Sequence, residues 1–257
     1  MDDKLKKTAV EAARASGEVL VKYFRSSLDV EVKDELSPLV SKADREAEAA
    51  MRAVIMNAFP AHAIKGEELA DFIPEGHSVN AITWTLDPLD GTIAYLSGLP
   101  TFVVLIGVWL GNRPLLGLIY QPLTKDLWLG DVNGTTLNGT PIRVDDYPNQ
   151  PFIMATTSPD FLSKRTMGVF DKLRKKAAVT HFGGDGHLYG SLASGRISFI
   201  IEEGLNWYDV AALVPIVIGA GGFICSFFGT KIEPNNKKYS IISGTSKVWA
   251  SEFMTML

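Results

Sequence analysis

The segment from Trp84 to Thr92 is the part of this sequence best suited to chemistry. A strand there delivers two carboxylates, Asp87 and Asp90, into a turn that holds a proline and a glycine. Proline fixes its own φ and biases the preceding residue towards extended geometry, and glycine lets the backbone approach a ligand closely. The two carboxylates and the Leu89 carbonyl can therefore face one point, and such a cluster of oxygen ligands suits a hard cation.

The residues that follow are suited to binding an anion. Gly91 and Thr92 are expected to begin a short helix, whose free N–H groups can bind phosphate. The alternative is an exposed turn, because each residue type in this segment is common in turns. Two further acidic residues favour a site: Glu67 follows an expected strand, and Asp209 lies at an expected helix start. Together these carboxylates can complete a polynuclear Mg2+ site.

The N-terminal half is expected to place two helices before a set of strands. Apolar residues recur at three- and four-residue steps from Leu5 to Phe24 and from Ala43 to Phe59, which is typical of helices with one buried face. Strands that follow one another like a meander, with tight turns such as Asn133-Gly134, are expected over residues 81–86, 101–110, 115–120 and 128–132.

The C-terminal half alternates strands and helices, which favours an α/β arrangement. The expected elements are strands over residues 152–156, 179–182, 197–201 and 239–243, and helices over residues 163–175 and 187–194. A last helix is expected from about Tyr208, interrupted by Pro215 and ended by Gly221-Gly222. We divide the chain into residues 1–148, with most of the candidate metal ligands, and residues 149–257, with Asp209 and the specificity residues; an extensive interface is expected between them.

Composition excludes several classes of protein. The 257 residues are 46% apolar and 21% charged, as in ordinary globular proteins, and 25 Lys and Arg stand against 29 Asp and Glu. No basic block is present, so no nucleic-acid partner is expected. The most apolar window, residues 210–228, is broken by Pro215 and glycines, so no membrane span is expected. The single cysteine, Cys225, is interpreted as a buried apolar residue; it allows no internal disulfide and fits a cytoplasmic location without a secretory signal.

These acidic residues and their neighbours resemble the inositol monophosphatase family of Mg2+-dependent, Li+-sensitive phosphatases. Three blocks carry the resemblance: Gly66-Glu67-Glu68, W-T-L-D-P-L-D-G-T-I-A-Y from Trp84 to Tyr95, and Tyr208-Asp209-Val210-Ala211-Ala212 followed by Gly219-Ala220-Gly221-Gly222. The resemblance covers nearly the whole chain. It implies an α/β fold, α+β in the N-terminal half and α/β in the C-terminal half, layered as the αβαβα sandwich of the inositol monophosphatase and fructose-1,6-bisphosphatase type.

The resemblance also implies a role for each site residue. Two or three Mg2+ ions would be bound by Glu67, Asp87, the Leu89 carbonyl, Asp90 and Asp209. The catalytic residues would be Asp44, Glu67, Asp90 and Thr92, with Asp44 and Thr92 just behind the nucleophilic water. The phosphate would contact Gly91 and Thr92.

Three of these residues have a simpler interpretation. Ser41-Lys42-Ala43-Asp44 also fits a capping box at the start of the second helix. Asp209 can similarly act only as a charge at a helix N-terminus, and Thr92 as an ordinary N-cap. The structural and catalytic roles do not exclude one another.

The substrate is less well determined by the sequence. Gly183-Gly184-Asp185 and Glu202 look most like the histidinol-phosphatase branch, in which Asp185, Glu202 and Asp209 would contact the substrate. Acidic residues near the leaving group suit an amine or imidazolium, and Glu202 can equally accept hydrogen bonds from a polyol. Asn206-Trp207 departs from the Lys-Pro expected in that branch. Histidinol phosphate and inositol phosphate therefore both stay open.

Other expectations follow from the same resemblance. The partner is a small phosphorylated metabolite, and the family suggests a homodimer. A 3'(2'),5'-bisphosphate nucleotidase, a sugar bisphosphatase and a catalytically silent metal- or partner-binding member are the alternatives on the same fold. The sequence leaves the role of Lys33, near the mouth of the proposed site, open.

Overall fold

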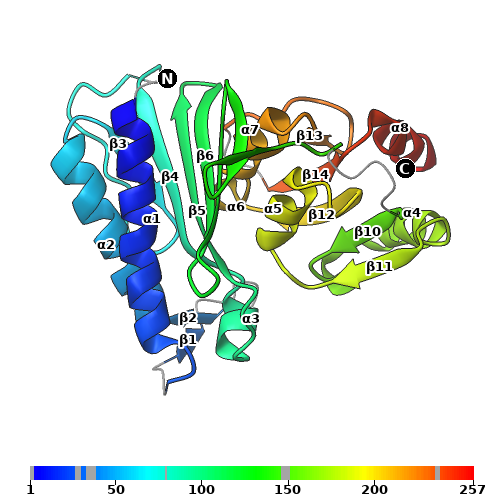
Figure 1. The fold of residues 1–257 in the computed structure, drawn as a ribbon, viewed down its shortest axis with the longest axis horizontal. Coiled ribbons are helices and arrows are strands. Elements are labelled where there is room, and N and C mark those ends of the chain that lie inside the picture. Colours follow the sequence, from blue (N-terminus) through cyan, green and yellow to red (C-terminus); the bar gives the residue numbers. More distant parts are fainter. Residues whose placement is uncertain (1–2, 27–29, 33–38, 79, 146–150, 235–237) are drawn as a thin grey trace.

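The structure is a computed structural model that describes residues 3–26, 30–32, 39–78, 80–145, 151–234 and 238–257. The chain forms five layers in the order helices, sheet, helices, sheet, helices (Figure 1). This architecture confirms the expected αβαβα sandwich. Lys33 and the expected boundary between residues 148 and 149 lie outside the described residues.

The first layer is a pair of helices, α1 (Asp3–Tyr23) and α2 (Lys42–Ala58), as the apolar periodicity predicts. They pack side by side on one face of the larger sheet (Figure 1). Their buried faces are rich in small residues, including Ala9, Ala13 and Ala47, which let the two helices approach each other closely. A short antiparallel pair, β1 (Val30–Val32) and β2 (Leu39–Ser41), lies between them in the sequence.

The larger sheet has seven strands, and their spatial order follows the sequence. They are β3 (Ala63–Gly66), β4 (Ile82–Asp90), β5 (Val103–Leu110), β6 (Arg113–Gln121), β7 (Asp126–Asp131), β8 (Gly134–Leu137) and β9 (Thr140–Ile142). From β4 to β9 every neighbouring pair is antiparallel, which confirms the expected meander. Only β3 pairs in parallel, with β4.

Strand β4 runs past its expected end at Leu86 and leads into α3 (Thr92–Leu96). Its pairing with β5 shifts register between Asp87 and Asp90. Pro88 lies in this interval, and a residue without an N–H cannot donate to a sheet ladder, so the strand bulges there. Because of the bulge, the side chains of Asp87 and Asp90 do not follow the regular alternation between the two faces of the sheet.

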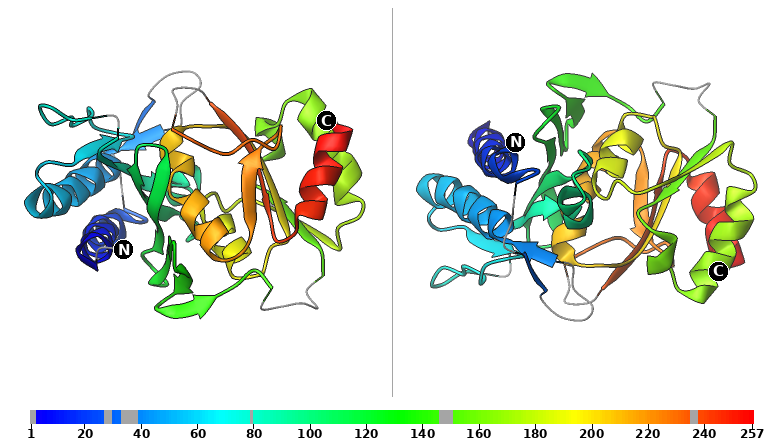
Figure 2. Two further views of the ribbon diagram at one scale, coloured as in Figure 1. Left: turned by 90° about the horizontal axis from the view of Figure 1, so that it is seen from above. Right: turned by 90° about the horizontal axis from the view of Figure 1, so that it is seen from below.

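The smaller sheet has the order β11-β10-β12-β14-β13. Its strands are β10 (Ile153–Thr156), β11 (Val179–Phe182), β12 (Phe199–Leu205), β13 (Phe223–Ser226) and β14 (Tyr239–Gly244). Its outer face carries α4 (Lys164–Arg174) and α8 (Lys247–Met256), as Figure 2 shows, and a single 3-10 turn, η1 (Pro159–Phe161), precedes α4. The parallel neighbours of β10 agree with the expected α/β character of this half.

The middle layer consists of α5 (His187–Ala193), α6 (Trp207–Val210) and α7 (Leu213–Gly219). The prediction of a helix from about Tyr208 that Pro215 interrupts is wrong. The break falls at Ala211 and Ala212, and Pro215 lies in the first turn of α7, where a backbone N–H has no acceptor within the helix.

Strand β13 and helix α8 were not predicted, so the helix ended by Gly221-Gly222 is not the last one. Cys225 lies on β13 and is half-buried, which corrects the buried position expected for it. Burial raises the pKa of its thiol, which disfavours the reactive thiolate. This raised pKa argues against a nucleophilic role for Cys225.

A row of glycines lets α6 and α7 approach the larger sheet. Gly107 pairs with Gly117, and Gly117 pairs with Gly130, so the row crosses three adjacent strands. A Cβ atom at any of the three would overlap backbone atoms of residues 211–216. The C-terminal half therefore packs directly on the N-terminal sheet, and the two halves share one apolar core.

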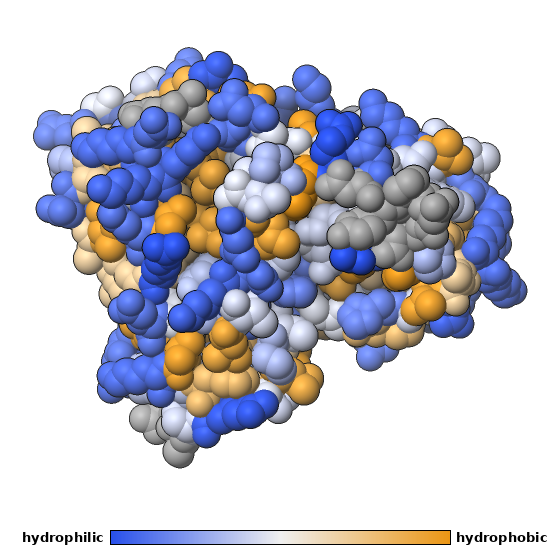
Figure 3. Space-filling view, in the orientation of Figure 1, coloured by the Kyte–Doolittle hydropathy of each residue, from blue (hydrophilic) through white to orange (hydrophobic). Residues whose placement is uncertain are grey.

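None of the helices in the described ranges is both long and apolar enough to span a bilayer. Figure 3 shows hydrophilic and apolar side chains interspersed over one face of the molecule.

Candidate active site

A cavity of about 510 Å³ opens where the two halves meet. It lies between the end of β4, the start of α5, β12 and α6. Its lining contains seven carboxylate side chains: Glu67, Asp87, Asp90, Asp185, Glu202, Glu203 and Asp209. Of the described residues that line it, Lys238 is the single cation. This strong excess of negative charge calls for bound cations.

Three of the carboxylates meet at one point. Asp87, Asp90 and Asp209 each offer an oxygen, and these oxygens lie within 4.8 Å of one another. Glu67 faces the same cavity from the end of β3, and Leu89 lines it as well. The five residues expected to bind metal are therefore together in the structure, although they come from three separate parts of the chain.

Burial and mutual repulsion disfavour the ionised forms of these carboxylates in the protein alone. Burial raises the pKa of Asp87 and of Asp90 well above the ordinary range, and the neighbouring carboxylates raise both further. Burial also raises the pKa of Asp209 to about 6. A divalent cation would offset this charge, and a set of only oxygen donors fits a hard ion such as Mg2+. The residues present therefore fit the expected metal.

The turn after Asp87 is held by its own hydrogen bonds. The Leu89 N–H donates to Asp87 Oδ1 at 3.1 Å, and Thr92 Oγ1 donates to the Leu89 carbonyl at 3.1 Å. Gly91 has a φ of 91°, a conformation that glycine adopts without strain. The Thr92 hydroxyl is thus oriented by the same carbonyl that is a candidate metal ligand.

Residues of the C-terminal half close the other side of the cavity. The Gly186 N–H donates to the Asp90 carboxylate. The Asp185 side chain lies directly over Gly91, because a Cβ atom at Gly91 would come within 2.9 Å of Asp185 Oδ2. Asp185 therefore lies next to the expected phosphate position.

Glu202 is buried in the same wall, with 3% of its surface exposed. Its Oε1 accepts a hydrogen bond of 2.7 Å from the Thr157 N–H. Burial raises the pKa of Glu202 to about 8 and that of Asp185 to about 6. Both predicted substrate residues thus face the cavity, in positions where a positively charged group would favour their ionised forms.

Asp209 combines two roles that the sequence left open. Its Oδ2 accepts a hydrogen bond of 2.6 Å from the Asn206 N–H, which caps α6, and its carboxylate also belongs to the cluster of three. Asn206 Oδ1 accepts from Lys238 Nζ at 2.6 Å. Trp207 packs edge-on against Trp109, with ring centroids 4.9 Å apart, so it acts as a core residue.

Asp44 lies in the first turn of α2, with 2% of its surface exposed. It is close enough to Tyr95 to help raise the pKa of that phenol. Tyr95 belongs to α3, the helix that begins with Thr92, so Asp44 lies behind the cavity wall and not in the lining.

Two residues that the sequence does not mark, Glu48 and Arg52, hold the turn that carries Glu67. Glu48 is fully buried in α2 and makes an ion pair of 2.7 Å with Arg52. Glu48 Oε2 also accepts from the Glu68 N–H at 2.7 Å, and Arg52 donates to the Leu69 carbonyl at 3.0 Å. The i,i+4 spacing of Glu48 and Arg52 is typical of exposed helical pairs, so nothing in the sequence marks this one as buried.

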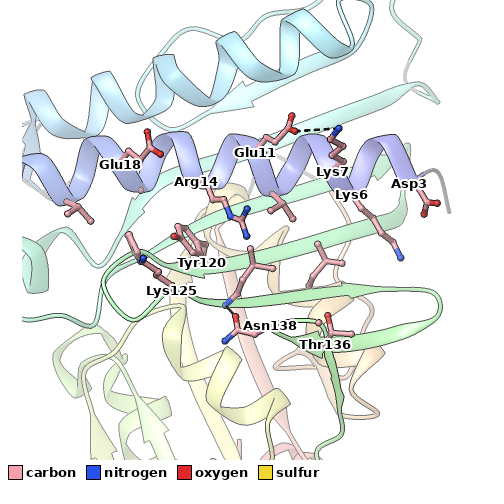
Figure 4. A pocket seen from close by; sticks show the side chains of 17 residues that line it. Asp3, Lys6, Lys7, Glu11, Arg14, Glu18, Tyr120, Lys125, Thr136 and Asn138 are labelled. Atoms are coloured by element: carbon pink, nitrogen blue, oxygen red, sulfur yellow. Dashed lines mark hydrogen bonds and ion pairs between the residues drawn. The ribbon is translucent and has the colours of Figure 1, made fainter.

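A larger groove lies between α1 and strands β6 to β8, and its side chains are shown in Figure 4. Basic Arg14 and Lys125 alternate along it with acidic Glu11 and Glu18. The carboxylates that could hold a metal lie in the smaller cavity, within the described part of the chain. The smaller cavity is therefore the candidate active site.

Asp185 and Glu202 form an acidic wall of the cavity, and the raised pKa of Glu202 predicts a pH dependence of stability. The folded-state pKa of Glu202 is about 8, above its ordinary value of 4.5, so its contribution to stability is complete below about pH 4.5 and is lost as the pH rises through 8. Glu202→Gln cannot ionise and keeps an acceptor for Thr157. In metal-free protein, the unfolding free energy of Glu202→Gln minus that of wild type should rise by roughly several kcal/mol between pH 5 and pH 9. Urea titrations at the two pH values measure this difference, and a difference that does not change with pH would contradict the prediction.

A sequence model of the inositol monophosphatase family matches residues 1–255. The bifunctional phosphatase IMPL2, chloroplastic, of Arabidopsis thaliana is 42% identical over 223 residues, which are 85% of this chain and 63% of the plant protein. The chain thus spans less than two thirds of that relative's length. The histidinol-phosphatase of Chlorobaculum parvum is 32% identical over 250 residues, which are 96% of this chain and 92% of that protein.

Solved structures share the fold of this chain. An inositol monophosphatase from Zymomonas mobilis has a TM-score of 0.82 and 34% identity, and the match covers 97% of this chain and 96% of the other. The Thermotoga maritima IMPase has a TM-score of 0.85 at 24% identity, and the match covers 99% of this chain and 97% of the other, which supports the fold alone.

Proposed function

Since this chain belongs to the inositol monophosphatase family, we propose that it hydrolyses a small phosphate monoester in the acidic cavity. One observation carries the proposal: Asp87, Asp90 and Asp209 converge at one point within 4.8 Å. Buried carboxylates at this spacing repel one another, so an arrangement of this kind is maintained for a cation.

We further propose that the cavity takes two or three Mg2+ ions. The residues that would hold them are Glu67, Asp87, the Leu89 carbonyl, Asp90 and Asp209. When bound, Mg2+ lowers the pKa of water and offsets negative charge on a transferring phosphoryl group. The Thr92 hydroxyl would orient the attacking water, with Asp44 behind it, and the phosphate would contact Gly91 and Thr92. The hydrogen bond from Thr92 to the Leu89 carbonyl supports this role, because it fixes the hydroxyl beside a candidate ligand.

The acidic wall supports a leaving group with a positive charge. Asp185 and Glu202 lie in the part of the cavity that the C-terminal half contributes. An ammonium or imidazolium there would gain Coulomb attraction and would hold both groups ionised. A relative named as a histidinol-phosphatase is consistent with such a substrate. We therefore propose histidinol phosphate first.

Inositol phosphate is the second candidate, and one observation favours it. Glu202 takes one backbone hydrogen bond at a single oxygen, and its carboxylate has further acceptor capacity for polyol hydroxyls. Substrates with a second phosphate are disfavoured, because Lys238 is the single cation among the described lining residues.

The test is phosphate release from a panel of esters. Histidinol phosphate, inositol 1-phosphate, 3'-phosphoadenosine 5'-phosphate and fructose 1,6-bisphosphate would be compared with and without Mg2+ and Li+. We expect one of the first two to exceed the others by at least about ten-fold in kcat/KM, to need Mg2+, and to be inhibited by Li+. No release from any of them would contradict the phosphatase proposal and favour a silent metal-binding member, which titration with Mg2+ would detect.

Two expectations from the sequence stay predictions. Light scattering on the purified protein would test the homodimer. Microscopy of the tagged protein would test the cytoplasmic location.

A further inference from the structure

The hydroxyl of Tyr189 is buried without a hydrogen-bond partner. Tyr189 lies on α5 with 2% of its surface exposed. Within the described residues, its oxygen finds no donor or acceptor. Burial of a hydroxyl without a partner costs folding free energy, so the fold itself gains nothing from this atom.

Tyr189 lines the candidate active site. Burial raises the pKa of its phenol, and the charges of Glu202, Asp90 and Asp209 raise it further. Tyr189 therefore shares one cavity with the three-carboxylate cluster and with Asp185 and Glu202.

Two other buried hydroxyls without a partner, in the described part of the chain, belong to residues that do not line the cavity. Thr85 Oγ1 and Thr156 Oγ1 are also buried without a partner. Neither threonine lines the cavity, whereas Tyr189 does. An unsatisfied polar atom at the wall of a cavity can be completed by a ligand, but one inside packed protein cannot.

We propose that Tyr189 is a further substrate-binding residue, whose hydroxyl makes a hydrogen bond with a polar substituent of the leaving group. With an amine or imidazole substrate, the phenolic oxygen accepts from N–H; with a polyol, it exchanges a hydrogen bond with a hydroxyl. This inference rests on the proposed phosphatase function and adds a specificity residue to it. Asp185 and Glu202 would supply charge on this side of the site, and Tyr189 a directional contact.

Tyr189→Phe tests the proposal, because it removes one oxygen and keeps the ring. With the better of histidinol phosphate and inositol 1-phosphate, KM should rise about ten-fold while kcat changes little. With phenyl phosphate, whose leaving group carries no polar substituent for the hydroxyl to contact, KM should not show this rise. The Tm of the variant should equal or exceed that of wild type, since no hydrogen bond of the fold is lost.

A matched variant controls for loss of a buried hydroxyl. The Tyr95 hydroxyl is also buried, but it donates to the Leu20 carbonyl at 2.7 Å. Tyr95→Phe should therefore lower Tm, whereas Tyr189→Phe should not. A similar loss of Tm in the two variants would assign Tyr189 a structural role and overturn the inference.

The kinetic outcomes separate this inference from the proposed function. Equal effects of Tyr189→Phe on both kinds of substrate, or no effect on either, would overturn the inference and leave the phosphatase proposal intact. If the wild-type protein hydrolyses no ester, the phosphatase proposal fails, and the inference is judged by binding of L-histidinol to the wild type and to Tyr189→Phe, measured as a Tm shift. A shift in wild type that is lost in the variant supports it; equal shifts, including none, overturn it.

Discussion

Asp90→Asn is expected to lower kcat on the order of a thousand-fold and to leave the fold intact. Asp90 belongs to the acidic cluster with Asp87 and Asp209. The substitution removes one negative charge from the set proposed to hold Mg2+, while the asparagine oxygen can still accept from the Gly186 N–H. Turnover with saturating Mg2+ is the measurement.

Stability should move in the opposite direction from activity. Burial and the neighbouring carboxylates raise the pKa of Asp90, so its ionised form is costly in the metal-free protein. Tm in the presence of a chelator should therefore be equal to or above that of wild type. Asp171→Asn is the matched control, because that carboxylate pairs with Arg174 on α4 and lies in the outer helical layer. Normal turnover by Asp90→Asn would refute the assignment of the site.

Of the substitutions proposed here, Glu48→Ala is expected to lower the unfolding free energy most, by about 3–5 kcal/mol. The substitution leaves the Arg52 guanidinium, whose side chain is only 10% exposed, without its buried counter-charge. It also removes the acceptor of the Glu68 N–H, and so frees the turn that carries Glu67. Urea unfolding measures the first effect, and the Mg2+ concentration for half-maximal activity, which should rise, measures the second.

The same helix offers a control for this prediction. Glu46 pairs with Lys42 at 3.5 Å in an exposed i,i+4 pair. Glu46→Ala removes a carboxylate from α2 without leaving a buried charge, so its effect on stability should be far smaller. If the two alanine variants unfold at the same urea concentration, the buried pair does not hold this region.

Local sequence patterns account for most elements of the fold. The apolar periodicity of α1 and α2 and the alternating strands with Asn-Gly turns depend on residues close in sequence, so they could be predicted. The secondary structure of short apolar runs was harder to predict. Phe223 to Ser226 forms β13 only because β14 pairs with it, and α8 is held by packing of Ala250 and Phe253 on the smaller sheet.

The break between α6 and α7 shows how tertiary contacts override a local signal. Pro215 is the residue that local rules mark as a helix breaker, yet α7 includes it. The helix breaks instead at Ala211, whose carbonyl accepts a hydrogen bond of 2.9 Å from Trp109 Nε1, 102 residues earlier. The row of glycines on β5 to β7 lets this backbone reach the sheet, and the sequence gives no sign that these three residues are neighbours.

By itself, the sequence determined the chemical types at the site and the part of it that one strand carries. Asp87, the Leu89 carbonyl and Asp90 occupy one turn, whose geometry Pro88 and Gly91 restrict locally. Only the tertiary structure brought this turn together with Glu67, Asp185, Tyr189, Glu202 and Asp209, and placed Glu48 and Arg52 behind the turn that carries Glu67. The physical reason is that burial and charge depend on neighbours in space. A tyrosine, a glutamate or an arginine acquires its function from the packing of distant segments, whereas a turn acquires its geometry from the residues within it.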